Sequence, residues 1–303
     1  MKPLEHTTGK SRFLKYLISS EMDQKWGISV TTLGMSVIQK DYNHYPILSG
    51  HPSEYCFNTA KGRIFDEYQL VYISEGKGRF YTSRDKYVEV IAGDVFLLRP
   101  SVWHNYYPDP ESGWVEHWIG FKGFIIDYRF DNGFFPEKKP LYKIGIRMDF
   151  MNFFMEAIDI AQKEESNYQQ YLAGIVNHLL GLTLYYDNKR NFVPREVSSM
   201  DKARTIIKEN IYESISPEEI ASRLNMSYTW FRKTFKEYTG MSPGKYIQNM
   251  KMEVAKDLLS YTDSPVKEIA FKLKYEDNSH FINIFKTITG YTPIQYRKMN
   301  RTE

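Results

Sequence analysis

The chain of 303 residues contains a single cysteine, Cys56, which excludes an intrachain disulfide and fits a reducing compartment. Its first residues hold no apolar run of roughly 7–15 residues, so we expect no secretory signal peptide. No stretch approaches the roughly 18 uninterrupted apolar residues that predict a membrane span. Together these absences predict a soluble, cytoplasmic protein.

The sequence also lacks the groupings that mark common catalytic sites. It contains no Ser/His/Asp or Cys/His set in a motif context, and no glycine-rich phosphate-binding loop. We therefore assign no catalytic residue, expect no cofactor, and predict that the protein is not an enzyme.

The composition is close to that of an ordinary soluble protein, with 42% hydrophobic and 25% charged residues. At roughly 150 residues per domain, the length predicts two domains. The net charge of +3 is unevenly distributed: residues 201–303 hold 17 Lys and Arg against 13 Asp and Glu, whereas residues 1–200 hold 23 against 24. The small positive excess therefore belongs to the C-terminal third.

The C-terminal third contains an internal duplication. The segment SYTWFRKTFKEYTGMSP (227–243) is matched by DNSHFINIFKTITGYTP (277–293). Two copies are too few for a solenoid, so the repeat predicts a two-part module. Five anchor residues recur at an interval of 50: Phe231 and Phe281, Phe235 and Phe285, Gly240 and Gly290, Pro243 and Pro293, and Tyr246 and Tyr296.

Each copy predicts two short helices joined by a tight turn. In the first copy Ser216 is a candidate N-cap, Pro217 suits the first helical position, and Gly240 ends the second helix. The second copy is expected to open in the same way, at Ser264. A long helix over 243–260 is expected to join the two copies.

The second helix of each copy has an inward aromatic face and an outward polar face. Two short helices with a tight turn are typical of a helix-turn-helix, whose second helix enters the major groove of DNA. There Arg pairs with guanine, Asn with adenine, and Lys contacts phosphate or guanine. The outward residues are Thr229, Arg232, Lys233 and Lys236 in the first copy and Asn278, Ser279, His280, Asn283 and Lys286 in the second.

Two alternatives apply to this surface. The outward charges could be only a solvated face, although a second copy at a fixed interval argues against it. The module could instead bind RNA, but RNA readers usually present aromatic side chains on a sheet, and the aromatic residues here face inward.

The segment from Asp201 to Lys298 resembles the DNA-binding domain of the AraC/XylS family of bacterial transcription regulators. The resemblance is carried by ISPEEIASRLNMSYTWFRKTFKEYTGMSPGKYI, by the AKDLL of the connecting helix, and by SPVKEIAFKLKYEDNSHFINIFKTITGYTPIQYR. It implies that one monomer places two recognition helices in successive segments of the major groove. The contacts that it implies fall on Thr229, Arg232 and Lys233, and on Asn278, Ser279, His280 and Asn283.

Residues from about 28 to 130 predict short β-strands, as in a sandwich or a small barrel. The phrases EGKG, AGDVFLLRPSVWHNYYP and WVEHWIGFKG resemble the cupin-like effector domain of the same family. The resemblances imply an α+β multidomain protein with an N-terminal cupin-like β-barrel and a C-terminal all-α double helix-turn-helix. Strands are expected at 69–74, 79–83, 87–91, 95–100 and 114–121, with turns at EGKG (75–78) and AGD (92–94).

A cupin-type enzyme with an accessory basic domain is the main alternative. Metal-binding cupins resemble a pattern of two close His and a Glu on one strand, followed by a later His. The corresponding strand here, QLVYISEGKG, has no His, and only His104 stands where the later ligand would be. His104 and His117 do not supply the roughly three ligands that a catalytic metal needs, so no metal site is predicted.

Inward aromatic and isolated polar side chains suit a small-molecule pocket better. By resemblance to sugar-binding relatives, the candidate ligand-binding residues are Arg63, Tyr106, Glu116 and Trp118, with His104 beside them. Glu116 and Trp118 are two residues apart on one strand, so they point to the same face, which Trp114 shares. The aromatic residues could equally belong to the core, and the ligand could be a non-sugar molecule or a protein partner.

Residues 149–187 predict two helices with a break near Ser166-Asn167. The apolar arc of the second helix is wider than one packing face needs. It could pack only on the barrel, but the family resemblance favours a homodimer helix with an exposed leucine-rich face that includes Leu179. The expected domains are an effector-binding barrel (1–148), a helical dimerisation segment (149–187), a polar linker (188–199) and a DNA-binding domain (200–303).

The sequence therefore predicts a sequence-specific DNA-binding transcription regulator of carbohydrate-utilisation genes, located in the bacterial cytoplasm at the nucleoid. Its expected partners are a double-stranded DNA operator, a small-molecule effector such as a sugar or oligosaccharide, a second copy of the chain, and RNA polymerase.

Overall fold

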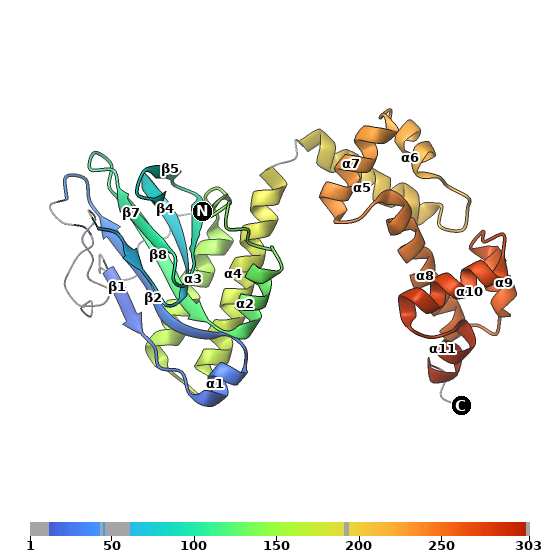
Figure 1. Ribbon diagram of the computed structural model, residues 1–303, viewed down its shortest axis with the longest axis horizontal. Helices are drawn as coiled ribbons and strands as arrows, with labels where there is room; N and C mark the ends of the chain where they lie inside the picture. The colour runs from blue at the N-terminus through green and yellow to red at the C-terminus, as the bar shows by residue number, and fades with distance from the viewer. Residues whose placement is uncertain (1–11, 43–44, 46–60, 191–193, 301–303) are drawn as a thin grey trace, which may run out of the picture. The chain divides into compact units, whose positions relative to one another are not determined.

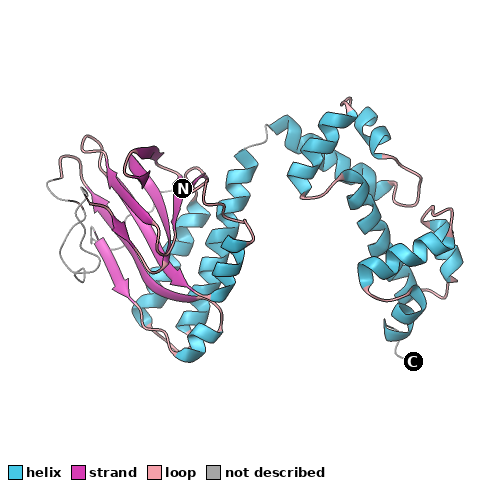
Figure 2. Ribbon diagram, viewed as in Figure 1, coloured by secondary structure: helices cyan, strands magenta, loops and turns pink. Residues whose placement is uncertain are grey.

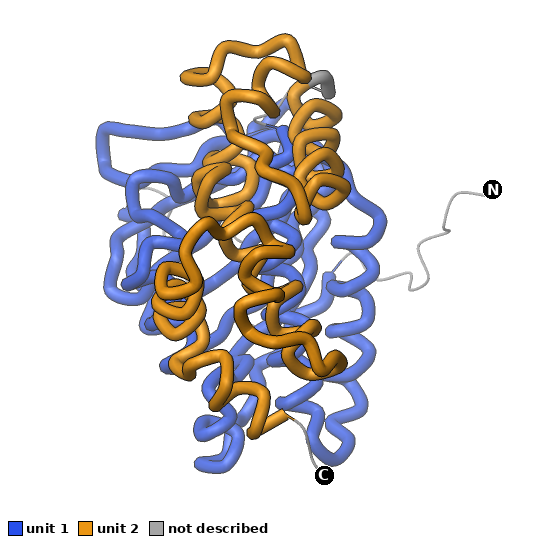
Figure 3. Tube along the Cα trace, turned by 90° about the vertical axis from the view of Figure 1, so that its right-hand side faces the viewer, with its two compact units in different colours: residues 1–191 blue, residues 192–303 orange. Residues whose placement is uncertain are grey.

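A computed structural model describes residues 12–42, 45, 61–190 and 194–300 (Figure 1). The chain divides into two compact units, residues 1–191 and 192–303, which Figure 3 colours separately. Cys56 lies outside the described residues. Within the described ranges, no helix combines the length and the apolar character needed to cross a membrane.

The first unit is built on an antiparallel sheet of nine strands among the described residues, with helices along one of its faces (Figure 2). Its main path runs β1-β2-β8-β4-β6-β9; β7 pairs with β3 and β4, and β5 pairs with β4. Three of the expected strands are confirmed as β5, β6 and β8. The strands are β1 (Arg12–Tyr16), β2 (Ser29–Ile38), β3 (Arg63–Ile64), β4 (Tyr68–Ser83), β5 (Lys86–Ile91), β6 (Asp94–Leu98), β7 (Trp103–Pro108), β8 (Trp114–Lys122) and β9 (Leu141–Lys143).

Strand β4 runs straight through EGKG, so the turn expected at 75–78 is wrong. The chain bulges there instead of reversing: the pairing with β8 shifts register between Ile73 and Glu75, and Gly76 has a φ of 79°. A Cβ at Gly76 would lie 2.2 Å from the carbonyl oxygen of Gly113, so only glycine fits. Beyond the bulge, the strand pairs with β5 and β7.

The two faces of β4 contribute to two different hydrophobic clusters. Leu70 and Tyr72 pack in the cluster that includes the helices, whereas Val71 and Ile73 pack in the interior of the barrel with Phe80. The helices of this unit are α1 (Glu21–Lys25), α2 (Phe124–Asp131), α3 (Met148–Lys163) and α4 (Tyr168–Arg190). The predicted helix break is confirmed between α3 and α4, where Glu164 and Asn167 both have positive φ.

The leucine-rich outer face predicted for the second helix is wrong. Leu179 on α4 is 0% exposed and belongs to the cluster formed with the sheet and α3. The apolar arc of α4 is wide because the helix packs against both α3 and the sheet. It does not leave an apolar side exposed for a second chain. Along the middle of α4 the exposed side is instead small, polar or aromatic, and consists of Tyr171, Gly174, Asn177, His178, Gly181 and Tyr185.

The polar linker predicted over 188–199 is helical at both ends. Helix α4 continues to Arg190, and α5 (Pro194–Glu209) begins at a proline, which needs no N–H partner in the first turn. Met200 and Ala203 of α5 are buried in the second unit. Residues 191–193, which separate the two helices, lie outside the described part of the chain.

All the regular elements in the described residues of the second unit are helices, and most of their ends follow the sequence signals. The Oγ of Ser216 accepts a hydrogen bond from the backbone N–H of Glu219 at 3.1 Å, and Gly240 ends its helix with a φ of 81°. In the second copy the helix begins at Val266 with Pro265 as N-cap, so Ser264 does not cap it as expected. The remaining helices are α6 (Pro217–Arg223), α7 (Tyr228–Thr239), α8 (Pro243–Tyr261), α9 (Val266–Lys272), α10 (Asn278–Thr289) and α11 (Pro293–Asn300).

The duplication is repeated in the packing of this unit. The rings of Phe235 and Tyr246 meet edge to face with centroids 5.3 Å apart at 84°, and those of Phe285 and Tyr296 do so at 5.4 Å and 84°. Each copy therefore holds its second helix with the same aromatic contact, and α8 connects the two small cores.

Candidate ligand cavity and nucleic-acid interface

The first unit encloses a cavity of about 40 Å³ inside the barrel. Four of the five predicted ligand-binding residues line it, namely Arg63, Tyr106, Glu116 and Trp118. They come from three strands, β3, β7 and β8, that the fold brings together. The other lining residues are Leu14, Tyr16, Thr32, Tyr45, Phe65 and Gln69.

Strand geometry explains why these side chains share the cavity. Glu116 and Trp118 alternate with outward-facing neighbours on β8, and Arg63 on β3 pairs with His104 on β7. The ring of Trp118 lies across Gly34 on β2, where an added Cβ would come within 2.4 Å of it. Glycine at this position therefore makes room for the indole.

The cavity combines a cation, a carboxylate and aromatic faces. The guanidinium of Arg63 donates a hydrogen bond to the Tyr106 hydroxyl and lies 4.4 Å from the ring centroid of Phe65. On the other side, the Tyr45 hydroxyl donates to Oε2 of Glu116 at 2.9 Å. Such a mixture can bind a neutral polar molecule through both donors and acceptors.

Burial shifts the ionisation of the cavity walls. Glu116 is 7% exposed, and burial raises the pKa of its carboxyl to about 7, although the Tyr45 hydroxyl and the charge of Arg63 act in the opposite direction. Burial likewise raises the pKa of Tyr106 to about 12, so this phenol stays neutral. Near neutral pH, Glu116 is therefore present both as a hydrogen-bond donor and as an acceptor.

The fifth predicted residue, His104, does not line this cavity. Its ring stacks on Tyr106 with centroids 6.3 Å apart, but it faces a second cavity of the same unit. Burial, and then the charge of Arg63, lower the pKa of His104 to about 3. His117 packs against Phe154 on the opposite, helix-covered side of the sheet. Within the described residues, no three His, Cys, Asp or Glu side chains are grouped to hold a metal.

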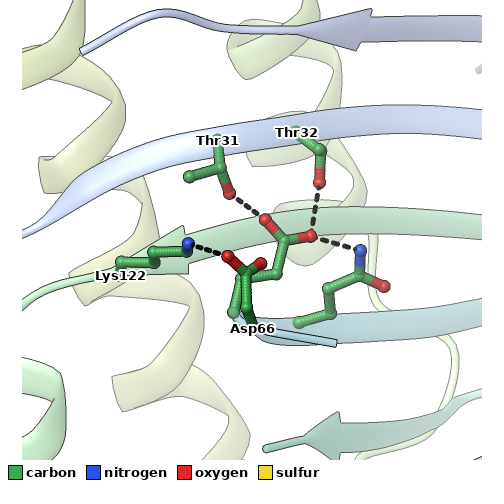
Figure 4. Close-up of polar contacts among 6 residues, drawn as sticks. Thr31, Thr32, Asp66 and Lys122 are labelled. Atoms are coloured by element: carbon green, nitrogen blue, oxygen red, sulfur yellow. Dashed lines mark hydrogen bonds and ion pairs between the residues drawn. The ribbon is translucent and has the colours of Figure 1, made fainter. Parts of the chain in front are cut away.

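Sequence reasoning missed two polar residues of the cavity wall and the buried carboxylate behind them. Thr32 and Gln69 line the cavity, and both are hydrogen-bonded to the buried carboxylate of Glu67, Thr32 at 3.1 Å and Gln69 at 2.7 Å. Thr31 donates a third hydrogen bond to Glu67, and an exposed ion pair of Asp66 and Lys122 lies nearby (Figure 4).

Burial raises the pKa of Glu67, and its three hydrogen bonds oppose that shift. The amide Nε2 of Gln69 is directed to Glu67, so this network fixes the orientation of two cavity side chains. A signal was present in the sequence, because Glu67 directly precedes the buried strand β4 and Gln69 lies at its start.

The predicted DNA-contacting residues lie on the second helix of each copy. On α7, Thr229, Arg232, Lys233 and Lys236 are all exposed, while Phe231 is fully buried. On α10, Ser279, His280, Asn283 and Lys286 are exposed, and Asn278 is half-buried at the helix start. Asp277 caps this helix by accepting from the backbone N–H groups of Ser279 and His280, both at 3.0 Å.

Sequence reasoning also missed two aromatic residues on α7. Tyr228 and Trp230 are each 38% exposed in the first turn of this helix, beside Thr229. Large exposed aromatic side chains at this end of a recognition helix can contact the methyl group of thymine or the sugar-phosphate backbone. A signal was present in the sequence, because Tyr228 and Trp230 do not share the helix face of Phe231 and Phe235, which faces the core.

Two family models match the chain, one in each unit. The AraC-like ligand binding domain matches residues 57–176, and a helix-turn-helix domain matches residues 220–299. The first match includes the four cavity residues and the second includes both recognition helices.

Similar proteins extend over most of the chain. The raffinose operon transcriptional regulatory protein RafR of Pediococcus pentosaceus is 26% identical over 79% of this chain and 88% of its own length. The MmsAB operon regulatory protein of Pseudomonas aeruginosa is 24% identical over 85% of this chain and 83% of its own. The lactose operon transcription activator of Staphylococcus xylosus is 24% identical over 77% and 85%, respectively.

Proposed function

Because the chain belongs to the AraC/XylS family of transcriptional regulators, we propose that it binds a sugar or oligosaccharide and thereby controls carbohydrate-utilisation genes. The observation that carries the proposal is the cavity in which Arg63, Glu116 and Trp118 meet. A sugar ring has an apolar face that stacks on an indole and hydroxyl groups that pair with a carboxylate and a guanidinium. The names of the raffinose and lactose operon relatives support the same class of effector.

Effector binding requires the cavity to enlarge. An engineered cavity that holds benzene measures about 150 Å³, and a sugar ring is bulkier than benzene, whereas this cavity measures only about 40 Å³. The Tyr45 hydroxyl occupies one oxygen of Glu116, which a sugar hydroxyl would take over. We therefore propose that a bound sugar displaces the Tyr45 hydroxyl from the Glu116 carboxyl.

The second unit supplies operator recognition through its two helix-turn-helix copies. The exposed Arg232 on α7 and Asn283 on α10 are assigned to base edges, and Lys236 and Lys286 to phosphates. Binding to an operator places the protein with the DNA of the bacterial cytoplasm. RNA polymerase is the proposed downstream partner, and no catalytic role is assigned.

A homodimer is part of the proposal, through the exposed side of α4 rather than its leucines. Gly174 and Gly181 lie two turns apart on that side, and a Cβ added to either one meets no atom within 4 Å. Small residues at this spacing let a second helix approach closely, with Tyr171 and Tyr185 at the ends of the contact.

The effector is tested by a thermal-shift screen of mono- and oligosaccharides on the full chain. A hit should raise the Tm with concentration, and the shift should disappear in Trp118→Ala and Glu116→Ala. Tyr81→Phe on β4, outside the cavity, is the control and should respond like the wild type. If only non-carbohydrate ligands stabilise the protein, the sugar assignment is wrong and the regulator assignment survives.

A further inference from the structure

The first unit contains a second cavity that shares no lining residue with the effector cavity. It measures about 120 Å³ and lies where β6 and β7 meet the segment between α2 and β9. This volume is close to the roughly 150 Å³ of an engineered cavity that binds benzene, so it can hold one six-membered ring. Its walls are mainly apolar and aromatic, and they include Phe80, Leu97, Trp103, Phe130, Phe135 and Tyr142.

Two residues of this wall carry polar atoms that are not satisfied. Nε2 of His104 and the hydroxyl of Tyr142 have no hydrogen-bond partner within the described part of the chain. The two side chains are 3% and 1% exposed. Leaving a buried polar group unpaired destabilises the folded state, so two in one cavity wall point to a molecule that pairs with them.

The hydrogen bonding of His104 defines the chemistry of this molecule. Its Nδ1 lies 3.1 Å from the carbonyl oxygen of Val102, which can only accept, so Nδ1 carries the proton. Burial keeps the imidazole neutral by lowering its pKa to about 3. Nε2 is therefore an acceptor and needs an O–H or N–H donor, whereas the neutral Tyr142 hydroxyl can donate or accept.

The cations around the cavity are already engaged. The guanidinium of Arg99 donates to the carbonyl oxygen of Phe135 and lies 4.6 Å from the ring centroid of Phe130. Lys139 forms an ion pair with Asp187. An anionic ligand would have to break these contacts, so a neutral one is favoured.

We propose that this cavity is a second ligand site, for a neutral molecule of one six-membered ring that carries a hydroxyl group. The ring occupies the aromatic walls, and the hydroxyl pairs with His104 Nε2 and Tyr142. His104 stacks on Tyr106, so this site and the effector cavity lie on either side of one pair of rings.

The test compares phenol with toluene, which has the same ring without the hydroxyl, by isothermal titration into the full chain. Phenol should bind saturably with one equivalent and about tenfold more tightly than toluene, the factor given by one hydrogen bond of ordinary strength. Tyr142→Phe should fold, because it only removes an unpaired hydroxyl, and should reduce the preference for phenol. Leu97→Phe, which fills the cavity, should abolish binding of both probes.

Tyr87→Phe is the matched control, because Tyr87 is exposed on β5 and lines neither cavity. It should bind phenol as the wild type does. Equal affinity for phenol and toluene, or no saturable binding of either, would overturn the proposal. So would a phenol affinity that is unchanged in both Tyr142→Phe and Leu97→Phe, because the molecule would then bind elsewhere.

Discussion

Replacing Glu116 by Gln should remove a pH-dependent loss of stability from the first unit. Burial raises the pKa of Glu116 from 4.5 to about 7. Because the pKa is higher in the folded state, folding favours the neutral acid. The contribution of the Glu116 carboxyl to stability is fully present below pH 4.5 and is lost as the pH rises through about 7. Gln keeps the shape of the side chain and stays neutral at every pH.

The size of the effect follows from the shift. Each pKa unit corresponds to about 1.4 kcal/mol, so a rise from 4.5 to about 7 corresponds to about 3 kcal/mol once Glu116 is fully ionised. The wild type should therefore lose about 3 kcal/mol relative to Glu116→Gln between about pH 4.5 and pH 8. Other titrating groups, such as Glu67, are common to both proteins and cancel in the difference.

The assay is urea unfolding of both full chains, followed by tryptophan fluorescence, which reports mainly on the first unit because four of the five tryptophans lie there. Tyr45→Phe removes the hydrogen bond that stabilises the carboxylate, so it should widen the pH-dependent loss. If the stability difference between wild type and Glu116→Gln is the same at both ends of the pH range, the carboxyl is not buried as described.

Three further changes test other parts of the structure. Leu179→Glu should unfold the first unit, because it places a charge at a fully buried position, whereas Gly181→Glu on the exposed side of α4 should keep the fold and yield a monomer in sedimentation; a folded Leu179→Glu protein would contradict the burial of Leu179. Phe235→Ala and Phe285→Ala should each cost about 3–5 kcal/mol in chemical unfolding of the second unit, and clearly unequal losses would contradict equivalent packing of the two copies. Arg232→Ala should weaken operator binding by about 1–3 kcal/mol and relax specificity at one base pair; a uniform loss on all DNA sequences would reassign Arg232 to a phosphate.

The second unit could be predicted almost completely from the sequence, because local signals determine its elements. Ser216, Gly240 and Gly290 set helix ends through their own backbone and side-chain chemistry. Because the module is duplicated, most helix and turn signals occur once in each copy and support one another. Pro265 departed from the first copy by taking the N-cap itself, which the repeat alone did not reveal.

The first unit was harder to predict because its decisive features depend on distant contacts. EGKG has the composition of a turn, yet pairing with β5, β7 and β8 keeps it in a strand with a bulge at Gly76. The wide apolar arc of α4, which includes Leu179, was interpreted as an exposed apolar face. Part of this arc packs against α3, and the periodicity of the sequence does not show where α3 lies. Four cavity residues were predicted through resemblance, whereas Tyr45 and the network around Glu67 depend on side chains from separate strands and loops.

The central claim is tested most directly by the affinity of the full chain for an operator selected from random DNA, measured against scrambled DNA at physiological salt. We expect the selected operator to bind at least about 10³-fold more tightly. A saccharide identified in the thermal-shift screen should change that affinity by about 5- to 150-fold, the usual range of coupling between two sites. Equal affinity for operator and scrambled DNA, with and without the saccharide, would contradict the account.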